Sequence, residues 1–192
     1  AATKDMKAKN SMKTGGFTLV ELLTVVTIIV ILAGMTVGAL GWVQRKAAVD
    51  KARAQMALLE NGLEQYYADT GTYPEANDSK GLAMYYALFG DGVGPDGLKN
   101  TRDDNGPIDG VPDEGATVYV PELDPNANSG LLEGPEGKAP TRLVDPFGNS
   151  WQYIGGDRYK SRRNNPDFDI YSKGPDGDGT PSKPGADDIK NW

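Results

Sequence analysis

The sequence predicts an α+β fold: one long amino-terminal helix, with a transmembrane half and an amphipathic half, packed on a small antiparallel sheet with long loops. Three patterns predict this arrangement. A long apolar run passes directly into a stripe of apolar residues at helical spacing. Two short runs near the carboxyl end alternate as strands do. Between the helix and these runs, segments crowded with Gly, Pro, Asp and Asn predict loops.

The apolar run forms the first half of the predicted helix. From Leu22 to Val43 no residue is charged. A helix of this length spans roughly 33 Å, enough for the hydrocarbon core of a bilayer. We therefore expect this run to cross a membrane as a helix, preceded by a short polar segment that carries several lysines. Basic residues flank both ends of the run about equally, so their count does not set its orientation.

The second half of the helix, residues 44–71, is amphipathic and is expected to pack against a globular head at 72–192. Gly71 supplies a stop and Pro74 forbids a restart, so one helix should run from about Thr18 to Asp69. The apolar stripe recurs at alternating spacings of three and four residues: Val49, Ala52, Met56, Leu59, Leu63 and Tyr66.

Three elements of the head follow from local patterns. Gly81–Leu88 is expected to form a short second helix. The turn Pro146–Asn149 precedes an alternating run that ends at Ile154, which predicts one strand of a hairpin. Phe168–Ser172 alternates in the same way and gives a second strand.

The stretch 90–142 is an outlier, because so long an irregular segment is usually either functional or disordered. We interpret it as a solvated acidic insertion in which only residues 117–120 and 131–132 can bury side chains. A cation site there is the alternative, and we propose none. The residues that such a site would use are Asp96, Asp103, Asp104, Asn105 and Asp109.

Composition excludes several classes of protein. The net charge is −7, and residues 17–192 alone carry −10, because residues 1–16 hold four lysines and one aspartate, so nucleic acid is not an expected partner. The absence of Cys excludes disulfides, and the absence of His removes the usual general base and the commonest zinc ligand. No nucleophile elbow, phosphate loop or zinc motif is present, so we expect no enzyme. A pair of carboxylates acting as in glycosidases is the enzymatic alternative.

Glu21 places a carboxylate at the start of the apolar run. An unpaired carboxylate at the end of a transmembrane stretch costs a few kcal/mol, so this one should reach the interface, be protonated or find a cation. An interfacial glutamate without a partner is the simpler alternative.

Two acidic clusters lie at the carboxyl end, in Ser172–Gly179 and in Ala186–Trp192, around a loop rich in Gly and Pro. Calcium takes about six to eight oxygens, from carboxylates and from carbonyls exposed by tight turns. The spacing does not match a helix-loop-helix calcium motif. The residues alone therefore leave two alternatives, a calcium loop at 172–192 and a surface turn with solvated acids.

The amino-terminal pattern of Gly16, then Phe17–Glu21, then an apolar helix resembles the class III signal of type IV pilins and type II secretion pseudopilins. This resemblance implies that a prepilin peptidase cuts between Gly16 and Phe17 and methylates the new terminus at Phe17. It thereby implies a basic leader at residues 1–16 and a transmembrane and assembly helix at 17–43. It also implies an assembly role for Glu21, whose carboxylate would meet the terminal amine of a neighbouring subunit. A plain signal anchor with an accidental Gly-Phe junction is the alternative.

A second resemblance links the head to the major pseudopilins of type II secretion. It runs through Leu59–Tyr67, Asp69–Pro74 and the carboxyl-terminal Asp-Gly loop with its Asp-Asp-Ile segment. In that family the loop binds calcium, so the resemblance implies calcium as a cofactor. The candidate ligands are Asp176, Asp187 and Asp188, with Asp178 a weaker candidate and Ser172 contributing a carbonyl oxygen.

These resemblances imply a structural filament subunit, a major pseudopilin that polymerises into the periplasmic pseudopilus and drives export of folded proteins. The implied partners are copies of itself, minor pseudopilins, an inner-membrane assembly platform with its ATPase, and the prepilin peptidase. The resemblance also implies a single-pass inner-membrane protein with a cytoplasmic leader and a periplasmic head, whose filament lies in the periplasm or at the cell surface. A cysteine-free type IV pilin of an adhesive or motility filament is the alternative.

Overall fold

The computed structural model describes residues 16–92, 106–180 and 183–192, and the side chains of residues 36–40 lie outside that description. The chain divides into two compact units, residues 1–43 and 44–192, and each is described by itself. Helix α1 (Leu19–Thr70) contributes its first half to one unit and its second half to the other.

In the first unit, all the described large apolar side chains of α1 are exposed, and so is Phe17, which precedes the helix. Among the described residues, no helical segment combines the length and the apolar character that crossing a membrane requires. The side chains of residues 36–40, which belong to the predicted transmembrane span, lie outside the described part of the structure. The transmembrane role of residues 17–43 therefore stays a prediction. The exposed side chains are Phe17, Leu19, Val20, Leu22, Leu23, Val25, Val26, Ile28, Ile29, Val30, Ile31, Leu32, Met35, Trp42 and Val43.

The second half of α1 is the axis of the second unit, and its predicted apolar stripe is confirmed. Ala52, Met56, Leu59, Leu63 and Tyr66 are buried, and Val49 packs against the same core. The helix ends one residue beyond the predicted position, at Thr70. Gly71 then takes a left-handed conformation, with φ of 78°, and its N–H donates to the Tyr67 carbonyl at 2.8 Å.

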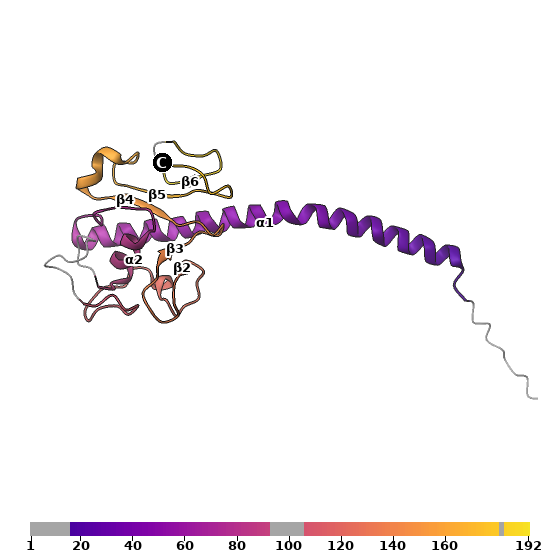
Figure 1. The fold of residues 1–192 in the computed structure, drawn as a ribbon, viewed down its shortest axis with the longest axis horizontal. Coiled ribbons are helices and arrows are strands. Elements are labelled where there is room, and N and C mark those ends of the chain that lie inside the picture. Colours follow the sequence, from indigo (N-terminus) through magenta and orange to yellow (C-terminus); the bar gives the residue numbers. More distant parts are fainter. Residues whose placement is uncertain (1–15, 93–105, 181–182) are drawn as a thin grey trace, which may run out of the picture. The chain divides into compact units, whose positions relative to one another are not determined.

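A four-stranded antiparallel sheet covers one side of this half of α1 (Figure 1). Its strands are β1 (Ala76–Asp78), β4 (Gln152–Gly155), β5 (Phe168–Ser172) and β6 (Ile189–Lys190), in that order. The predicted strands are β4 and β5, and they form the centre of the sheet. All residues of β5 are buried, as suits a strand paired on both edges.

The other side of α1 is covered by α2 (Leu82–Phe89), the predicted second helix, and by a two-stranded sheet of β2 (Leu132–Glu133) and β3 (Arg142–Leu143) (Figure 1). Two short 3-10 helices, η1 (Pro121–Leu123) and η2 (Asp157–Arg162), complete the described elements. The antiparallel α+β architecture of the head is thus confirmed.

The described part of the stretch 90–142 resembles the expected solvated insertion but packs on the head more closely than expected. Residues 93–105, which hold Asp96 and most of the other acids named above, lie outside the described part. From residue 106 onward the chain packs back on α2, where the N–H groups of Tyr119 and Val120 donate to the Leu88 carbonyl. Val120, Leu123 and Leu131 are buried in the core. Val120 and Leu131 lie in the two stretches that were expected to bury side chains, and Leu123 is an unexpected addition. Most other residues in 106–142, Asp109 among them, are exposed or half-buried, as expected of a solvated insertion.

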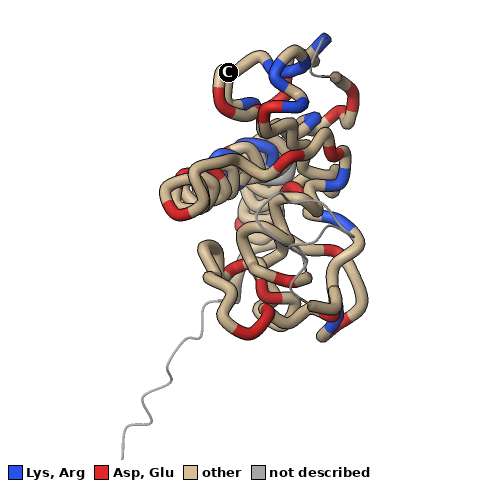
Figure 2. The backbone as a smooth tube through the Cα atoms, turned by 90° about the vertical axis from the view of Figure 1, so that its left-hand side faces the viewer, with Lys and Arg blue, Asp and Glu red and all other residues tan. Residues whose placement is uncertain are grey.

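Lysine and arginine residues (blue) and aspartate and glutamate residues (red) both occur along the described backbone of the head (Figure 2).

Candidate metal site and amino-terminal motif

The acidic loop is closed at both ends by the sheet. Strand β5 ends at Ser172, and β6 begins at Ile189, and these two residues are direct antiparallel partners. Because the pairing brings the two ends of the loop together, the acids that follow β5 lie beside the acids that precede β6. The sequence separation between the two clusters is therefore no obstacle to a shared site.

Three of the predicted ligands converge in the structure. One carboxylate oxygen from each of Asp176, Asp187 and Asp188 lies within 4.8 Å of the other two. Asp176 is exposed, and Asp187 and Asp188 are half-buried. Three carboxylates this close repel one another unless a cation or protons lie between them.

Backbone N–H groups hold each of these carboxylates in place. The N–H of Asp176 donates to Asp187 Oδ2 at 3.2 Å, and the N–H of Asp178 donates to Asp176 Oδ1 at 2.9 Å. The N–H of Gly185 donates to Asp188 Oδ2 at 2.8 Å. The other oxygen of this last carboxylate, Asp188 Oδ1, is buried, and no donor among the described residues reaches it.

Gly185 lies at the centre of an oxygen-lined cradle. A methyl group placed on it would lie 3.0 Å from Asp188 Oδ1, 3.1 Å from the Asp178 carbonyl oxygen and 3.4 Å from Asp187 Oδ1. Carboxylate and carbonyl oxygens that converge on one point, one of them without a donor, are the ligand set that a hard cation such as calcium prefers. The residues present therefore fit calcium.

The remaining predicted ligands behave differently. Asp178 is exposed and its carboxylate is outside the cluster, but its carbonyl oxygen lies in the cradle. Ser172 is fully buried, and its hydroxyl donates to Asp145 Oδ2 at 2.5 Å. The ligand role of the Ser172 carbonyl stays a prediction.

Tyr171 lies at the edge of this region, on β5. Burial raises the pKa of its phenol to about 12, and the charges of Asp188 and Asp169 act in the same direction. Its ring packs edge-on against Trp192, with the ring centroids 5.8 Å apart. The carboxyl-terminal residue thus contributes an aromatic contact that holds β6 beside β5.

The amino-terminal motif begins outside the helix. Gly16, Phe17 and Thr18 have no regular secondary structure, and α1 starts at Leu19. Phe17 is 84% exposed, and nothing lies within 4 Å of a methyl group placed on Gly16. The Gly16–Phe17 bond therefore lies in an exposed, non-helical stretch, the kind of backbone that a peptidase can bind.

Glu21 has a local partner that the sequence analysis did not anticipate. Oε2 of its carboxylate accepts hydrogen bonds from the Thr18 N–H at 2.8 Å and from the Thr18 hydroxyl at 2.7 Å. The N–H of Glu21 in turn donates to Thr18 Oγ1 at 3.3 Å. This reciprocal pair is a capping box, which satisfies N–H groups at the start of α1. The signal for it, a threonine three residues before a glutamate, is visible in the sequence.

Comparison with known proteins decides the family. The family model described as "Type II secretion system (T2SS), protein G" matches residues 41–87, and the one described as "Prokaryotic N-terminal methylation motif" matches residues 11–37. The type II secretion system core protein G of Escherichia coli strain K12 is 29% identical, over 94% of this chain and 92% of its own length. The core protein G of Vibrio cholerae is 30% identical, over 96% of this chain and 95% of its own. The chain belongs to the type II secretion system core protein G family.

A solved structure is also similar to this core protein G family member. It is titled as the crystal structure of the major pseudopilin from the type 2 secretion system of enterohaemorrhagic Escherichia coli. The sequence identity is 20%, the match covers 80% of this chain and 94% of that one, and the TM-score is 0.41.

The family that the sequence resemblance predicted is thus confirmed, and a methylation motif is present over residues 11–37, while the individual roles of Gly16, Phe17 and Glu21 stay predictions. Two features of this family member were not predicted. One is the capping role of Thr18, and the other is a pair of residues, Asp145 and Asn149, that contact the acidic loop from another part of the chain.

Proposed function

We propose that this chain is the major pseudopilin of a type II secretion system, the subunit that polymerises into the periplasmic filament that drives export of folded proteins. The observation that carries the proposal is the 30% identity to the core protein G of Vibrio cholerae across nearly the whole of both chains. In this function the chain is a structural subunit rather than an enzyme.

Processing is the first step of this function. A prepilin peptidase cuts between Gly16 and Phe17 and methylates the new amine, and the leader 1–16 is lost. The methylation motif and the exposed, non-helical Gly16–Phe17 bond support this step. The apolar half of α1 stays on the mature chain, because the cut precedes it.

The exposed apolar side chains of α1 then decide where the mature chain can reside. Burying one large apolar side chain contributes about 1.5–3 kcal/mol, and more than ten such side chains are exposed between Phe17 and Met35. That sum far exceeds the few kcal/mol that one carboxylate costs in an apolar environment. The inner membrane holds the helix before assembly, and the helices of neighbouring copies cover it in the filament.

Glu21 sets the register between copies. Its carboxylate lies about one helical turn from the amine freed at Phe17, and in a staggered stack of identical helices one subunit's amine can reach the next subunit's carboxylate. Inside its own chain the carboxylate is held by Thr18, which keeps it at the start of the helix. A charge pair removed from water is costly to break, so it favours one register over others.

Calcium is the proposed cofactor of the head, and Asp176, Asp187 and Asp188 with the Asp178 carbonyl are its proposed ligands. Bound calcium neutralises the repulsion among the three carboxylates and ties the loop to β6. In a chain without cysteine, such a tie does the work that a disulfide does elsewhere. The head then faces the periplasm and contacts minor pseudopilins and the inner-membrane assembly platform.

Deletion of the gene in its native host tests the function. We expect the extracellular proteins exported by the host's type II system to accumulate in the periplasm and to return to the medium when the parental gene is restored. A Gly16→Val gene, whose product the peptidase should not cut, is the matched control and should fail to restore export. Normal export in the deletion strain, with surface filaments lost instead, would favour the pilin alternative and overturn the proposal.

A further inference from the structure

A tight turn at Asp145–Asn149, between β3 and β4, lies against the acidic loop although it is far from it in sequence. The N–H of Asp145 donates to the Asn149 carbonyl at 2.9 Å, and the N–H of Gly148 donates to the Asp145 carbonyl at 3.1 Å. Gly148 has a φ of 89°, which the turn requires. These bonds make the turn a compact, rigid unit.

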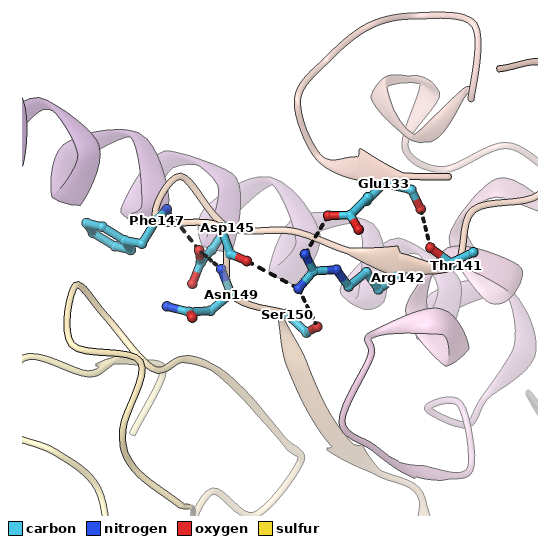
Figure 3. A network of polar contacts seen from close by, with 8 residues as sticks. Glu133, Thr141, Arg142, Asp145, Phe147, Asn149 and Ser150 are labelled. Atoms are coloured by element: carbon cyan, nitrogen blue, oxygen red, sulfur yellow. Dashed lines mark hydrogen bonds and ion pairs between the residues drawn. The ribbon is translucent and has the colours of Figure 1, made fainter. Parts of the chain in front are cut away.

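Asp145 joins this turn to the end of β5. Its side chain is only 3% exposed, and Oδ1 accepts the N–H groups of Phe147 at 2.9 Å and Asn149 at 2.8 Å (Figure 3). The other oxygen, Oδ2, accepts the Ser172 hydroxyl at 2.5 Å. A buried carboxylate whose two oxygens both accept hydrogen bonds is held in one position.

Asn149 and Ser172 together hold Gly174, the second residue of the loop after β5. The Asn149 side-chain N–H donates to the Gly174 carbonyl at 2.7 Å, and the Gly174 N–H donates to Ser172 Oγ at 3.1 Å. Both backbone polar groups of Gly174 are therefore bound by groups that Asp145 positions. Asn149 Oδ1 also lies 3.2 Å from the place where a methyl group on Gly177 would be, so one amide side chain contacts the loop on both sides of Asp176.

Gly174 in turn packs against the other half of the acid cluster. Its φ is 64°, and a methyl group on it would lie 2.3 Å from the Asp187 carbonyl oxygen. The backbone of Gly174 is thus enclosed between the turn and Asp187. A shift of the turn would move Gly174, and with it the separation between Asp176 and the pair Asp187 and Asp188.

We propose that Asn149 and Asp145 are positioning residues of the calcium site, which hold the two halves of the acidic loop at ligand distance without binding the metal themselves. This inference rests on the proposed calcium site. Without a cation the three carboxylates repel one another, so a loop without this support would open. The turn keeps the loop ordered before calcium arrives, which reduces the entropy lost on binding.

Calcium titration of the full chain in detergent tests the proposal. The variants are Asn149→Ala, which removes the donor to Gly174, and Ser172→Ala, which keeps the Ser172 carbonyl but removes its hydroxyl. Outer-sphere partners of metal ligands typically change affinity by about 10- to 100-fold, and we expect a loss of that size for Asn149→Ala and a smaller loss for Ser172→Ala. Asn126→Ala is the control, since Asn126 is exposed and its side chain bonds Asp124.

Calorimetry with CaCl2 gives the affinity, and the thermal unfolding midpoint in EDTA gives the stability without metal. We expect the calcium-dependent rise in midpoint to shrink in Asn149→Ala by more than its midpoint in EDTA falls. Parental affinity in both variants would overturn the positioning role and leave the calcium site standing. A parental chain that binds no calcium would overturn the site and this inference with it. If Asn149→Ala does not fold in EDTA, Ser172→Ala carries the test.

Discussion

Buried aspartates organise the loops of the head at the scale of single residues. Asp91, Asp145 and Asp169 are each at most 3% exposed, and each accepts two backbone N–H groups. Such carboxylates replace the hydrogen bonds that helices and strands supply elsewhere. Acids in Gly- and Pro-rich segments, which suggest a solvated surface in the sequence, are in these three cases structural.

Asp91 gives the sharpest test of this role. It accepts the Tyr85 hydroxyl at 2.7 Å and the N–H groups of Asp109 and Gly110, both at 3.0 Å. Asp91→Ala leaves these buried donors without an acceptor, and we expect a loss of about 3 kcal/mol in the free energy of unfolding, measured by denaturant titration. Asp109→Ala, which removes an exposed carboxylate, should cost less than about 1 kcal/mol. Equal losses in the two variants would contradict the structural role.

Glu21 combines a cap and a proposed charge pair, and two variants separate them. Glu21→Gln keeps a side-chain acceptor for Thr18 but loses the charge. Thr18→Val keeps the charge but loses the hydroxyl. We expect processing and membrane insertion in both, and filament yield, counted by electron microscopy, to fall about tenfold or more only in Glu21→Gln. Normal filaments from Glu21→Gln would show that the glutamate acts through the cap alone.

At the scale of elements, the second half of α1 is packed so closely at Gly62 that a larger side chain there would collide with its neighbours. A methyl group on Gly62 would lie 2.4 Å from a methyl carbon of Val120 and 3.3 Å from Leu88. Glycine within a helix usually costs about 0.5–1 kcal/mol relative to alanine. Here the close approach of the segment before η1 outweighs that cost.

Gly62→Ala is therefore expected to destabilise the chain by about 1–3 kcal/mol, although alanine is the better helix former. Thermal or denaturant unfolding of the full chain in detergent measures the change. Combining it with Val120→Ala, which removes the clashing methyl group, should recover part of the loss, so the two changes should not be additive. A stabilised single variant would mean that residues 118–120 do not pack on α1 as described.

Glu60, on the same half of α1, is expected to make the stability of the head depend on pH. Partial burial raises the pKa of its carboxyl group, and the charge of Glu64 adds to the rise, while a hydrogen bond with Asn191 opposes it. Because the folded-state pKa is above the unfolded value of 4.5, protonation favours folding. The stability that it contributes is present below that value and is lost as pH rises through the folded pKa.

Glu60→Gln imitates the protonated form at every pH. We expect this variant to be at least as stable as the parent at pH 7 and to gain less stability than the parent on acidification towards pH 5. Thermal unfolding at the two values measures the difference, with Glu136→Gln, at an exposed position, as the control. The same pH response in Glu60→Gln and the parent would contradict the prediction.

At the scale of the whole molecule, long periodic signals were predictable and short ones were not. The helices and the central strands β4 and β5 follow from periodicity in the sequence. Strands β1, β2, β3 and β6 have two or three residues each, too few for a pattern. β1 and β6 pair with the longer strands β4 and β5, and β2 and β3 pair with each other. The folding of residues 106–142 onto α2 depends on tertiary hydrogen bonds to Asp91 and Leu88, which no local pattern announces.

The candidate site was predictable in its acids and not in its supports. Asp176, Asp187 and Asp188 stand in two clusters near the carboxyl end, and the resemblance to the family pointed to them. Asn149 is 25 residues from the glycine that it binds, and Asp145 is 27 residues from Ser172. Contacts at such separations depend on the register of β4 against β5, which only the folded structure supplies.

Removal of calcium tests the site within the whole chain. Calcium at about 100 times its dissociation constant should stabilise the folded state by about 2.7 kcal/mol, so EGTA should lower the thermal unfolding midpoint and restored calcium should raise it again. Asp187→Asn removes one charge of the cluster and should abolish most of this response. An unchanged midpoint in EGTA would mean that the acids form only a solvated turn.

The most direct test of the central claim is the structure of the filament formed in cells that contain the secretion machinery, determined by electron cryomicroscopy. We expect copies of this chain that begin at N-methylated Phe17, with the apolar halves of α1 packed together in the core. The carboxylate of Glu21 should lie within hydrogen-bonding distance of the amine of a neighbouring copy. Filaments that lack this chain, or copies that begin elsewhere and leave Glu21 without that amine, would contradict the claim.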